Sequence, residues 1–335
     1  MKKLFALMLA MLMVLSLAGC TGTASSAAAS TAASAAVDSA AAKTEFKVGI
    51  IQLVQHDALD QACQGFQDAL VEAGKEGGYT FSFDVQNASG EQSNCATIAT
   101  KFVNDGVDLI LAIATPAAQA AAQATGDIPI LVTAVTDPES AGLVDSNEVP
   151  GGNVSGTSDM NPVEKQAALL QTLVPDAKTV GIMYCSAEDN SILQADLAKA
   201  AFEALGLEVT IATAADSNEI QSVTTKLCGE VDAIYIPTDN TFASAMPTVA
   251  MVAGPAGIPV ICGEESMTAA GGLATYSINY YNLGAMTAAQ AFDILVNGAD
   301  VSTMPIAYSA EEDLNLYINE DTATEIGITI PDSLK

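Results

Sequence analysis

The sequence predicts an α/β fold of two Rossmann-like lobes of parallel sheet with a ligand cleft between them. In residues 107–138, two apolar runs flank a helix pattern of small residues, which is typical of a strand–helix–strand unit with buried parallel strands. Residues 231–264 repeat this design, and Thr238 follows the first apolar run there as Thr115 does in the earlier unit. Two α/β halves of like construction are the simplest explanation of such a repeat.

Polar loops follow the predicted strands of both units. In open parallel sheets, ligands bind at the carboxyl ends of the strands, so these loops are predicted to line the cleft. Thr115 and Pro116 stand where a helix begins, because Thr can cap a helix and Pro suits its first turn. Asp137 and Asp239 occupy other strand ends.

Strands and helices are predicted to alternate along the folded part of the chain, which begins near Phe46. Besides the two repeated units, strands are predicted at 48–54, 80–85, 179–185, 207–212, 272–278, a short stretch near Ile306, and 314–318. Helices are predicted at 60–73, 95–103, 117–124, 162–173, a segment ending before Gly206, 219–227, 280–297, and a segment from Asp321.

Residues 1–20 form a predicted signal peptide. Two lysines precede an apolar stretch, and Leu17-Ala18-Gly19-Cys20 resembles the bacterial lipobox, in which the Cys is lipidated. The alternative, a transmembrane anchor, would need a longer apolar run. Residues 21–44 are mostly Ala, Ser and Thr, so we expect a flexible tether. The chain is therefore expected to be extracytoplasmic and held to the membrane by its lipid anchor only.

The composition restricts the chemistry of the site. The formal charge of −29 disfavours nucleic acid and anionic lipid as partners. The chain contains no Arg, so a ligand carboxylate must be held by backbone N–H groups and hydroxyls. His56 is the only His, which predicts no metal site, no cofactor and no catalytic residue. Besides Cys20, five Cys remain, and whether any of them pair is left open by the sequence: Cys63, Cys95, Cys185, Cys228 and Cys262.

Several stretches together resemble one family, and they cover nearly all of residues 46–327: VGIIQLVQHDALD, ATPAAQAAAQ, TAVTDP, PGGNVSGTSD, YCSAEDNS, IYIPTDN, ATYSINYYNLG and LYIN. The chain resembles the substrate-binding lipoproteins of ABC importers, in the group typified by tryptophan- and tyrosine-binding members. This resemblance implies the type I periplasmic-binding-protein fold, with chain crossings near 155–159, 276–279 and 304–307. An N-terminal lobe of 45–157 and 279–305 and a C-terminal lobe of 158–278 and 306–335 are expected.

The resemblance implies a monomer that captures a small ligand, most simply an aromatic amino acid, by hinge closure and delivers it to ABC permease subunits. We expect the ligand carboxylate at Thr115 and the helix start after Pro116, and the ammonium at Asp137 or Asp239. Each of these two acids could instead be a turn or cap residue, and Asp189 is expected on the outer side of its loop. A sugar or nucleoside receptor and an extracellular enzyme are the alternatives.

The residues predicted to bind the ligand lie at or near strand ends, and Tyr184 or Tyr276 is expected to pack on its side chain. They are Gln55, His56, Thr115, Pro116, Ala117, Thr136, Asp137, Asp159, Tyr184, Ser186, Glu188, Asn190, Thr238, Asp239, Asn240, Glu264 and Tyr276.

Overall fold

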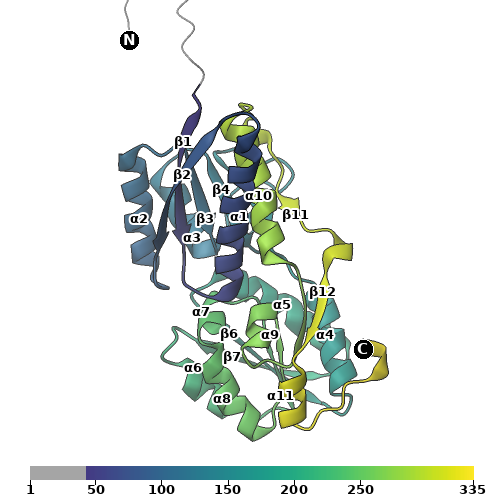
Figure 1. Ribbon diagram of the computed structural model, residues 1–335. Helices are drawn as coiled ribbons and strands as arrows, with labels where there is room; N and C mark the ends of the chain where they lie inside the picture. The colour runs from purple at the N-terminus through teal and green to yellow at the C-terminus, as the bar shows by residue number, and fades with distance from the viewer. Residues whose placement is uncertain (1–42) are drawn as a thin grey trace, which may run out of the picture. The chain divides into compact units, whose positions relative to one another are not determined.

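The computed structural model describes residues 43–335 as one compact unit built on two six-stranded sheets (Figure 1). The predicted signal peptide, Cys20 and nearly all of the predicted tether lie outside the described residues. Within residues 43–335, none of the helices combines the length and the apolar character needed to cross a membrane.

The first sheet has the strand order β11-β5-β4-β3-β1-β2, and its paired strands are parallel. Helices α1 and α10 pack together, and so do α2 and α3, so that helices cover both faces. We call this sheet and its helices the first lobe: β1 (Glu45–Gln52), α1 (Asp57–Lys75), β2 (Thr80–Asn87), α2 (Gln92–Asp105), β3 (Leu109–Ile113), α3 (Thr115–Ala124), β4 (Ile130–Val135), β5 (Val154–Ser158), α10 (Tyr280–Leu295) and β11 (Ala307–Tyr308).

The second sheet has the equivalent order β12-β10-β9-β8-β6-β7, which confirms the prediction of two halves of like design. Its strands are parallel except for β12, which runs antiparallel to β10. The second lobe comprises α4 (Val163–Leu173), β6 (Thr179–Cys185), α5 (Asp189–Ala204), β7 (Glu208–Ala214), α6 (Ile220–Leu227), β8 (Ala233–Ile236), α7 (Asn240–Ser244), α8 (Met246–Ala256), β9 (Val260–Cys262), α9 (Glu265–Ala269), β10 (Ala274–Ser277), β12 (Asn315–Ile318) and α11 (Glu320–Glu325).

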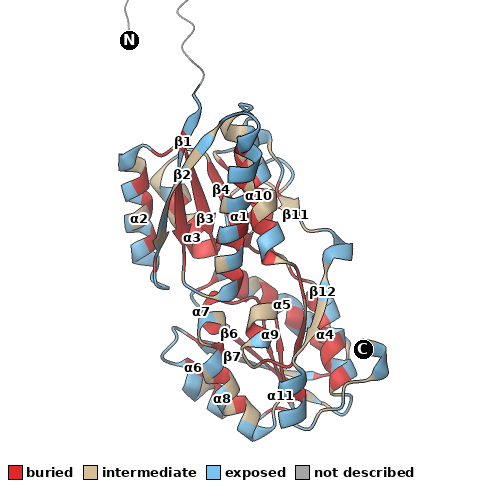
Figure 2. Ribbon diagram, in the orientation of Figure 1, coloured by how far each residue is buried: buried red, intermediate tan, exposed pale blue. Residues whose placement is uncertain are grey.

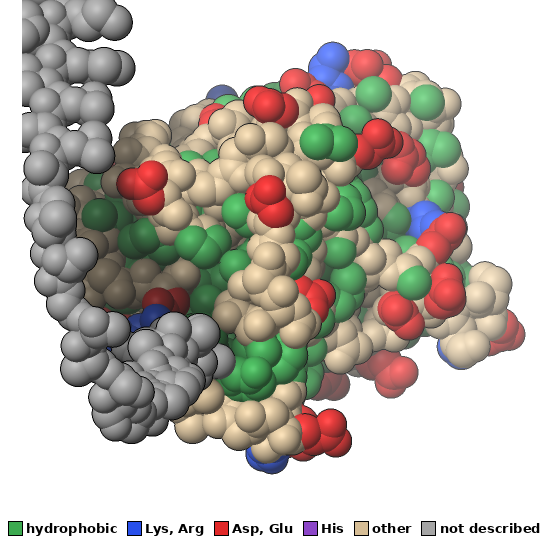
Figure 3. Space-filling view, turned by 90° about the horizontal axis from the view of Figure 1, so that it is seen from above, with side chains coloured by type: hydrophobic (Ala, Val, Ile, Leu, Met, Phe, Trp, Pro, Cys, Tyr) green, Lys and Arg blue, Asp and Glu red, His purple; other side chains and the backbone are tan. Residues whose placement is uncertain are grey.

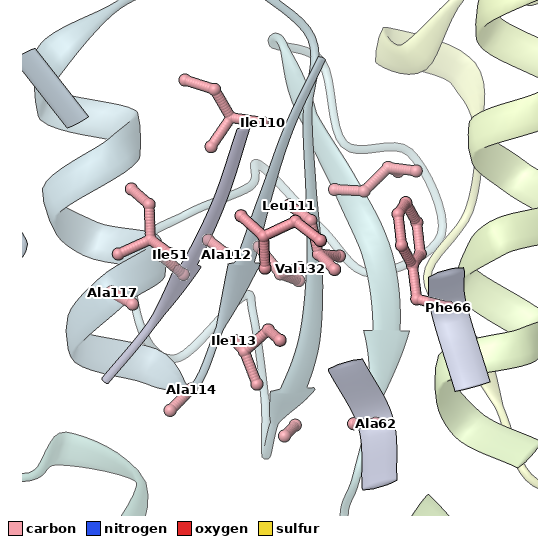
Figure 4. Packing of buried hydrophobic residues seen from close by; sticks show 14 of the residues in the cluster. Ile51, Ala62, Phe66, Ile110, Leu111, Ala112, Ile113, Ala114, Ala117 and Val132 are labelled. Atoms are coloured by element: carbon pink, nitrogen blue, oxygen red, sulfur yellow. The ribbon is translucent and has the colours of Figure 1, made fainter. Parts of the chain in front are cut away.

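The central strands are buried on both faces, as their unbroken apolar runs predict. All five residues of β3 and all four of β8 are buried (Figure 2). In Figure 4, side chains of β1, β3 and β4 fill the space between Ala117 of α3 and Phe66 of α1. These cores fix the strands, and therefore the positions of the loops that follow them.

The chain passes between the sheets three times. The first passage lies between β5 and α4, the second between β10 and α10, and the third between β11 and β12. The expected third crossing at 304–307 is wrong by a few residues, because Ala307 and Tyr308 still pair with Thr157 and Ser158 in the first sheet. That change of sheet falls between residues 308 and 315.

Helices α1 and α10 approach each other unusually closely. A Cβ atom added at Gly284 of α10 would lie 2.0 Å from the carbonyl oxygen of Ala62, and one added at Gly65 of α1 would lie 2.0 Å from the carbonyl oxygen of Tyr281. Glycine at both positions therefore lets the two backbones touch directly.

Many carboxylates lie on the surface, and they are scattered over the face shown in Figure 3. The cysteines in the described residues are free thiols, and only Cys228 is not buried. Burial raises the pKa of Cys63, Cys95 and Cys185 to about 11, so these thiols stay protonated and pack as small apolar groups.

Candidate functional site

The carboxyl ends of the strands of the two lobes face each other, and side chains join them directly. Four hydrogen bonds run between the lobes here, and we call them the cross-cleft hydrogen bonds. They are His56 Nε2 with Asn240 Oδ1 (3.3 Å), Gln92 Nε2 to Ala187 O (3.2 Å), Gln119 Nε2 to Asp189 Oδ2 (2.8 Å) and Gln194 Nε2 to Thr136 Oγ1 (3.0 Å).

Buried polar atoms that lack a partner gather at the same place. Among residues 43–335, five buried side-chain N or O atoms have no hydrogen-bond partner, and four of them belong to His56, Thr115, Asp159 and Asn190. We call Nδ1 of His56, Oγ1 of Thr115, Oδ1 of Asp159 and Oδ1 of Asn190 the open atoms. Buried polar atoms without a partner are rare, because burial costs each atom its hydrogen bond to water. Four of them at the strand ends therefore indicate a site where a ligand supplies the missing hydrogen bonds.

Backbone strain accompanies the open atom of Thr115. Ala114, directly before it, has φ 82°, and Ala134, near the end of the neighbouring strand β4, has φ 53°. A residue with a Cβ rarely adopts a positive φ, and such strain concentrates where function requires it. The kink at Ala114 turns the chain from β3 into α3, so that Thr115 and the free N–H groups of the helix start lie at the strand ends.

Four carboxyl groups at the strand ends are almost completely buried: Asp159, Glu188, Asp239 and Glu264. Three of them accept backbone N–H groups at the starts of short helices. Asp239 caps α7 through Phe242 N (2.8 Å) and also accepts from Cys185 N (2.6 Å). Glu264 caps α9 through Met267 N (2.8 Å), and Glu188 accepts from Thr241 N (2.9 Å).

Burial raises the pKa of Asp239 and of Glu264, because a charge in the protein interior loses its hydration. The nearby carboxylate of Glu188 raises the pKa of Asp239 further, whereas His56 opposes the rise at Glu264. These capping carboxyls are held by N–H groups that already compensate their charge, which leaves them poorly placed to bind an additional cation.

Asp159 differs from the other three. Its Oδ2 accepts a hydrogen bond from the hydroxyl of Tyr280 (2.9 Å), and its Oδ1 is an open atom. Burial raises the pKa of Asp159 to about 6, although hydrogen bonds from Tyr280 and Thr136 favour the charged form. Asp159 is therefore a buried acid with one oxygen held by Tyr280 and the other without a hydrogen-bond partner.

A hollow of about 160 Å³ lies between the lobes and approaches the open atoms through Pro116, which follows Thr115, and Glu188, which bonds to Asn190. Leu53, Val54 and Pro116 line it from the first lobe, and Cys185, Ala187 and Glu188 line it from the second. Its wall is mixed, because polar residues such as Gln92, Asp216 and Thr241 line it together with the apolar ones. Glu188 also bonds to Asn190 and Asn240. A ligand held at the open atoms would therefore have a partly polar space between the lobes beside it.

The structure brings many of the predicted residues together at this site. Each of them makes a hydrogen bond there, lines the hollow or carries an open atom. They are His56, Thr115, Pro116, Thr136, Asp159, Glu188, Asn190, Thr238, Asp239, Asn240 and Glu264.

Other predicted residues lie elsewhere. Gln55 and Ser186 are exposed, and Ala117 belongs to the core of the first lobe (Figure 4). Tyr184 and Tyr276 pack against a core of the second lobe, because their side chains project from the sheet face that α4 and α5 cover. Neither tyrosine lines the hollow.

Two acids also differ from expectation. Asp137 forms a turn, in which its Oδ1 accepts from Glu139 N (3.0 Å) and from Asn147 Nδ2 (2.9 Å), as the alternative interpretation stated. Asp189 is exposed at the start of α5, and its Oδ2 also accepts a hydrogen bond from Gln119 of the other lobe (2.8 Å), a contact that the sequence did not indicate.

Sequence reasoning did not select Asn161, Gln194 and Tyr280, although all three contribute hydrogen bonds at the strand ends. Gln194 lies within α5, and its position relative to the other buried residues of this helix does not distinguish it from a core residue. Tyr280 is part of the stretch ATYSINYYNLG, and its position next to a chain crossing was the available signal.

Comparison with known proteins agrees with this geometry. The family model described as ABC transporter substrate binding protein matches residues 47–335. A tyrosine-binding protein of Clostridioides difficile is 42% identical over 281 residues, which cover 84% of this chain and 81% of that protein. The crystal structure of an ABC domain in complex with L-Trp, from Streptococcus pneumonia, is 40% identical with a TM-score of 0.83, covering 87% of this chain and 97% of that one.

The fold and the site thus define an extracytoplasmic substrate-binding protein with the type I periplasmic-binding-protein fold, as the sequence predicted. This chain belongs to the ABC transporter substrate-binding protein family.

The described arrangement of the lobes matches a liganded relative better than an unliganded one. The ligand-free, open structure of a substrate-binding protein with adhesive properties from Clostridium difficile is 45% identical, yet its TM-score is only 0.65 over 86% of this chain and 96% of that one. The L-Trp complex, at lower identity, gives 0.83. The lobe arrangement that contains the cross-cleft hydrogen bonds is therefore more similar to the L-Trp complex than to the open structure.

Proposed function

We propose that this chain captures an aromatic amino acid between its lobes and delivers it to the permease subunits of an ABC importer. The observation that carries the proposal is the pair of open atoms on Asp159 and Thr115. Strands β5 and β3, which precede these residues, flank β4, so the two residues stand two strand spacings apart, about 9–10 Å.

An α-amino acid can bridge two residues at this spacing. Its ammonium and carboxylate carry opposite charges roughly 3 Å apart, and each can make a hydrogen bond of about 2.8 Å. The ammonium would meet Oδ1 of Asp159, and the carboxylate would meet Oγ1 of Thr115 with the N–H groups at the start of α3. This assignment replaces Asp137 and Asp239 as the expected ammonium partners.

The aromatic preference rests on the relatives. Their names refer to tyrosine and L-Trp, and the hollow between the lobes offers Leu53, Val54 and Pro116 as apolar contacts within a mixed wall. A sugar has no charged ends to match Asp159 and Thr115, and the chain has no Trp on which a sugar ring could stack. The zwitterion is therefore the better fit.

Titration calorimetry with L-tyrosine, L-tryptophan and a neutral hexose tests the proposal. We expect the two amino acids to bind and the hexose to give no heat. Small-angle scattering of the same samples should show compaction with the amino acids only, because a ligand held by both lobes favours the closed arrangement. Tight binding of the hexose, or an unchanged scattering profile at saturating amino acid, would contradict the proposed mode of capture.

We also propose that Cys20 carries the lipid that holds the protein at the membrane, on the strength of the sequence Leu17-Ala18-Gly19-Cys20. Cys20→Ala should move the protein from the membrane fraction to the soluble fraction, because one uncleaved apolar segment of this length spans a bilayer poorly. Cell fractionation with immunoblotting measures this. A variant that stays in the membrane fraction would indicate a transmembrane anchor instead.

A further inference from the structure

A chain of buried hydrogen bonds connects the ligand site to two of the three chain passages. Asp159 and Asn161 lie on the passage from β5 to α4, and Tyr280 opens α10 directly after the passage from β10. The hydroxyl of Tyr280 donates to Asp159 Oδ2 (2.9 Å) and accepts from Asn161 Nδ2 (3.4 Å). Asn161 Oδ1 in turn accepts from Ile278 N (3.0 Å) on the second passage.

All three side chains are sealed from solvent, since Asp159 and Asn161 are 2% exposed and Tyr280 is 3% exposed. A buried tyrosine hydroxyl needs one hydrogen-bond acceptor, and a backbone carbonyl would be sufficient. The acceptor of Tyr280 is instead Asp159, whose other carboxylate oxygen is an open atom. Because Tyr280 holds Oδ2, the carboxyl group cannot rotate freely, and the direction in which Oδ1 points is fixed.

We propose that Tyr280 is a positioning residue that aims Asp159 at the ligand ammonium, keeps that carboxylate charged, and links ligand binding to the two passages about which the lobes move. The inference rests on the proposed function, since it requires an ammonium at Asp159. A cation at Oδ1 favours the charged form of the carboxylate, which accepts the Tyr280 hydrogen bond more strongly than the protonated form does. The hydrogen bond that joins the two passages is thus stronger with ligand bound than with a proton on Asp159.

A pH dependence follows from this geometry. The titratable groups facing Asp159 are the Tyr280 hydroxyl and the Glu264 carboxyl, and His56 lies beside Glu264. An ammonium pairs with the charged form of Asp159 only, so protons compete with the ligand below the pKa of about 6. The Tyr280 hydrogen bond favours the charged form, so its removal raises the pKa of Asp159 further and moves the competition toward neutral pH.

The test is the affinity for L-tyrosine or L-tryptophan, measured by calorimetry between pH 5 and 8.5 for the wild type and Tyr280→Phe. Phenylalanine keeps the ring in the core of the first lobe and removes only the hydroxyl. We expect the midpoint of the pH profile to rise by about one unit, so that binding weakens about tenfold at pH 5, about twofold at pH 7 and hardly at all at pH 8.5. Contributions of Glu264 and His56 are common to both profiles and cancel in the comparison.

Tyr281→Phe is the matched control. It is the next residue of the same helix, and its hydroxyl also donates to an aspartate, Asp68 Oδ2 (3.1 Å), but on the exposed surface between α10 and α1. We expect its pH profile to coincide with that of the wild type. Equal losses at every pH for Tyr280→Phe would reduce Tyr280 to a structural residue and overturn the inference while leaving the proposed function intact. A wild type that binds neither amino acid would overturn both.

Discussion

Asp159→Asn is expected to weaken the binding of L-tyrosine and L-tryptophan by at least two orders of magnitude. The amide has the shape of the carboxylate, and its oxygen can still accept from Tyr280, but it offers no charge to the ammonium. A buried charge that loses its partner costs about 3–5 kcal/mol, which corresponds to two or more decades in affinity. Calorimetry at pH 7 measures the loss directly.

The same substitution should stabilise the protein without ligand. The pKa of Asp159 rises from 3.8 to about 6 on folding, so folding disfavours its charged form. The stability that a neutral Asp159 provides is complete below about pH 4 and is lost as the pH rises to 6, a difference of about 3 kcal/mol as an upper bound. Urea unfolding at pH 7 and at pH 4 should show the gain of Asp159→Asn at pH 7 only.

Two comparisons make the Asp159 result specific. Asp137→Asn changes an acid in a surface turn and should leave the affinity within about twofold, because Asp137 is used by its own loop. Thr115→Val, at the other end of the ligand, should cost about tenfold, since it removes one hydrogen bond to a charged group. Equal affinities of Asp159→Asn and the wild type would exclude Asp159 as the ammonium partner.

Gly284→Ala is expected to lower the free energy of unfolding by roughly 3 kcal/mol, at the upper end of overpacking effects. The new methyl carbon would lie 2.0 Å from the backbone oxygen of Ala62, which cannot rotate away as a side chain can. Helices α1 and α10 would have to separate along a contact in which Gly65 is equally close to Tyr281. Thermal and urea unfolding measure the change.

Gly254→Ala is the control for helix propensity. Gly254 also lies inside a helix, α8, but the added methyl would meet only the end of the Glu325 side chain, at 2.9 Å. A flexible carboxylate can move aside, so alanine should gain up to about 0.5–1 kcal/mol from its higher helix propensity. If Gly284→Ala were also neutral or stabilising, the close approach of α1 and α10 would have to be looser than described.

Much of the fold could be predicted because its determinants are local. The apolar runs that became β3, β4 and β6 need burial on both faces, and the Thr115-Pro116 pair marks a helix start in any context. The repeated unit then implied two sheets of one design. The position of the third passage was predicted wrongly, because Ala307 pairs with Thr157, a residue 150 positions earlier in the chain. The local sequence pattern contains no information about such a distant pairing.

The site was less predictable, because its chemistry depends on which polar atoms remain without a partner after folding. Asp137, Asp159 and Asp239 all follow strands, and nothing in their neighbourhoods ranks them. Only the folded chain shows that Asp239 meets Cys185 N and Phe242 N whereas Asp159 keeps an open oxygen. Likewise, the face to which Tyr184 projects is decided by where α4 and α5 pack.

The cross-cleft hydrogen bonds have a consequence for how quickly a ligand can depart. Gln92, Gln119 and Asp189 are exposed or partly exposed polar groups, so water replaces their bonds as they break. Each such bond contributes only about 0.5–1.5 kcal/mol net. These exposed hydrogen bonds therefore resist opening only weakly, and in the proposed binding mode the ligand's contacts with Asp159 and Thr115 set most of the residence time. This favours transport, because a permease that separates the lobes needs to supply little free energy to break the exposed cross-cleft hydrogen bonds before the substrate is released.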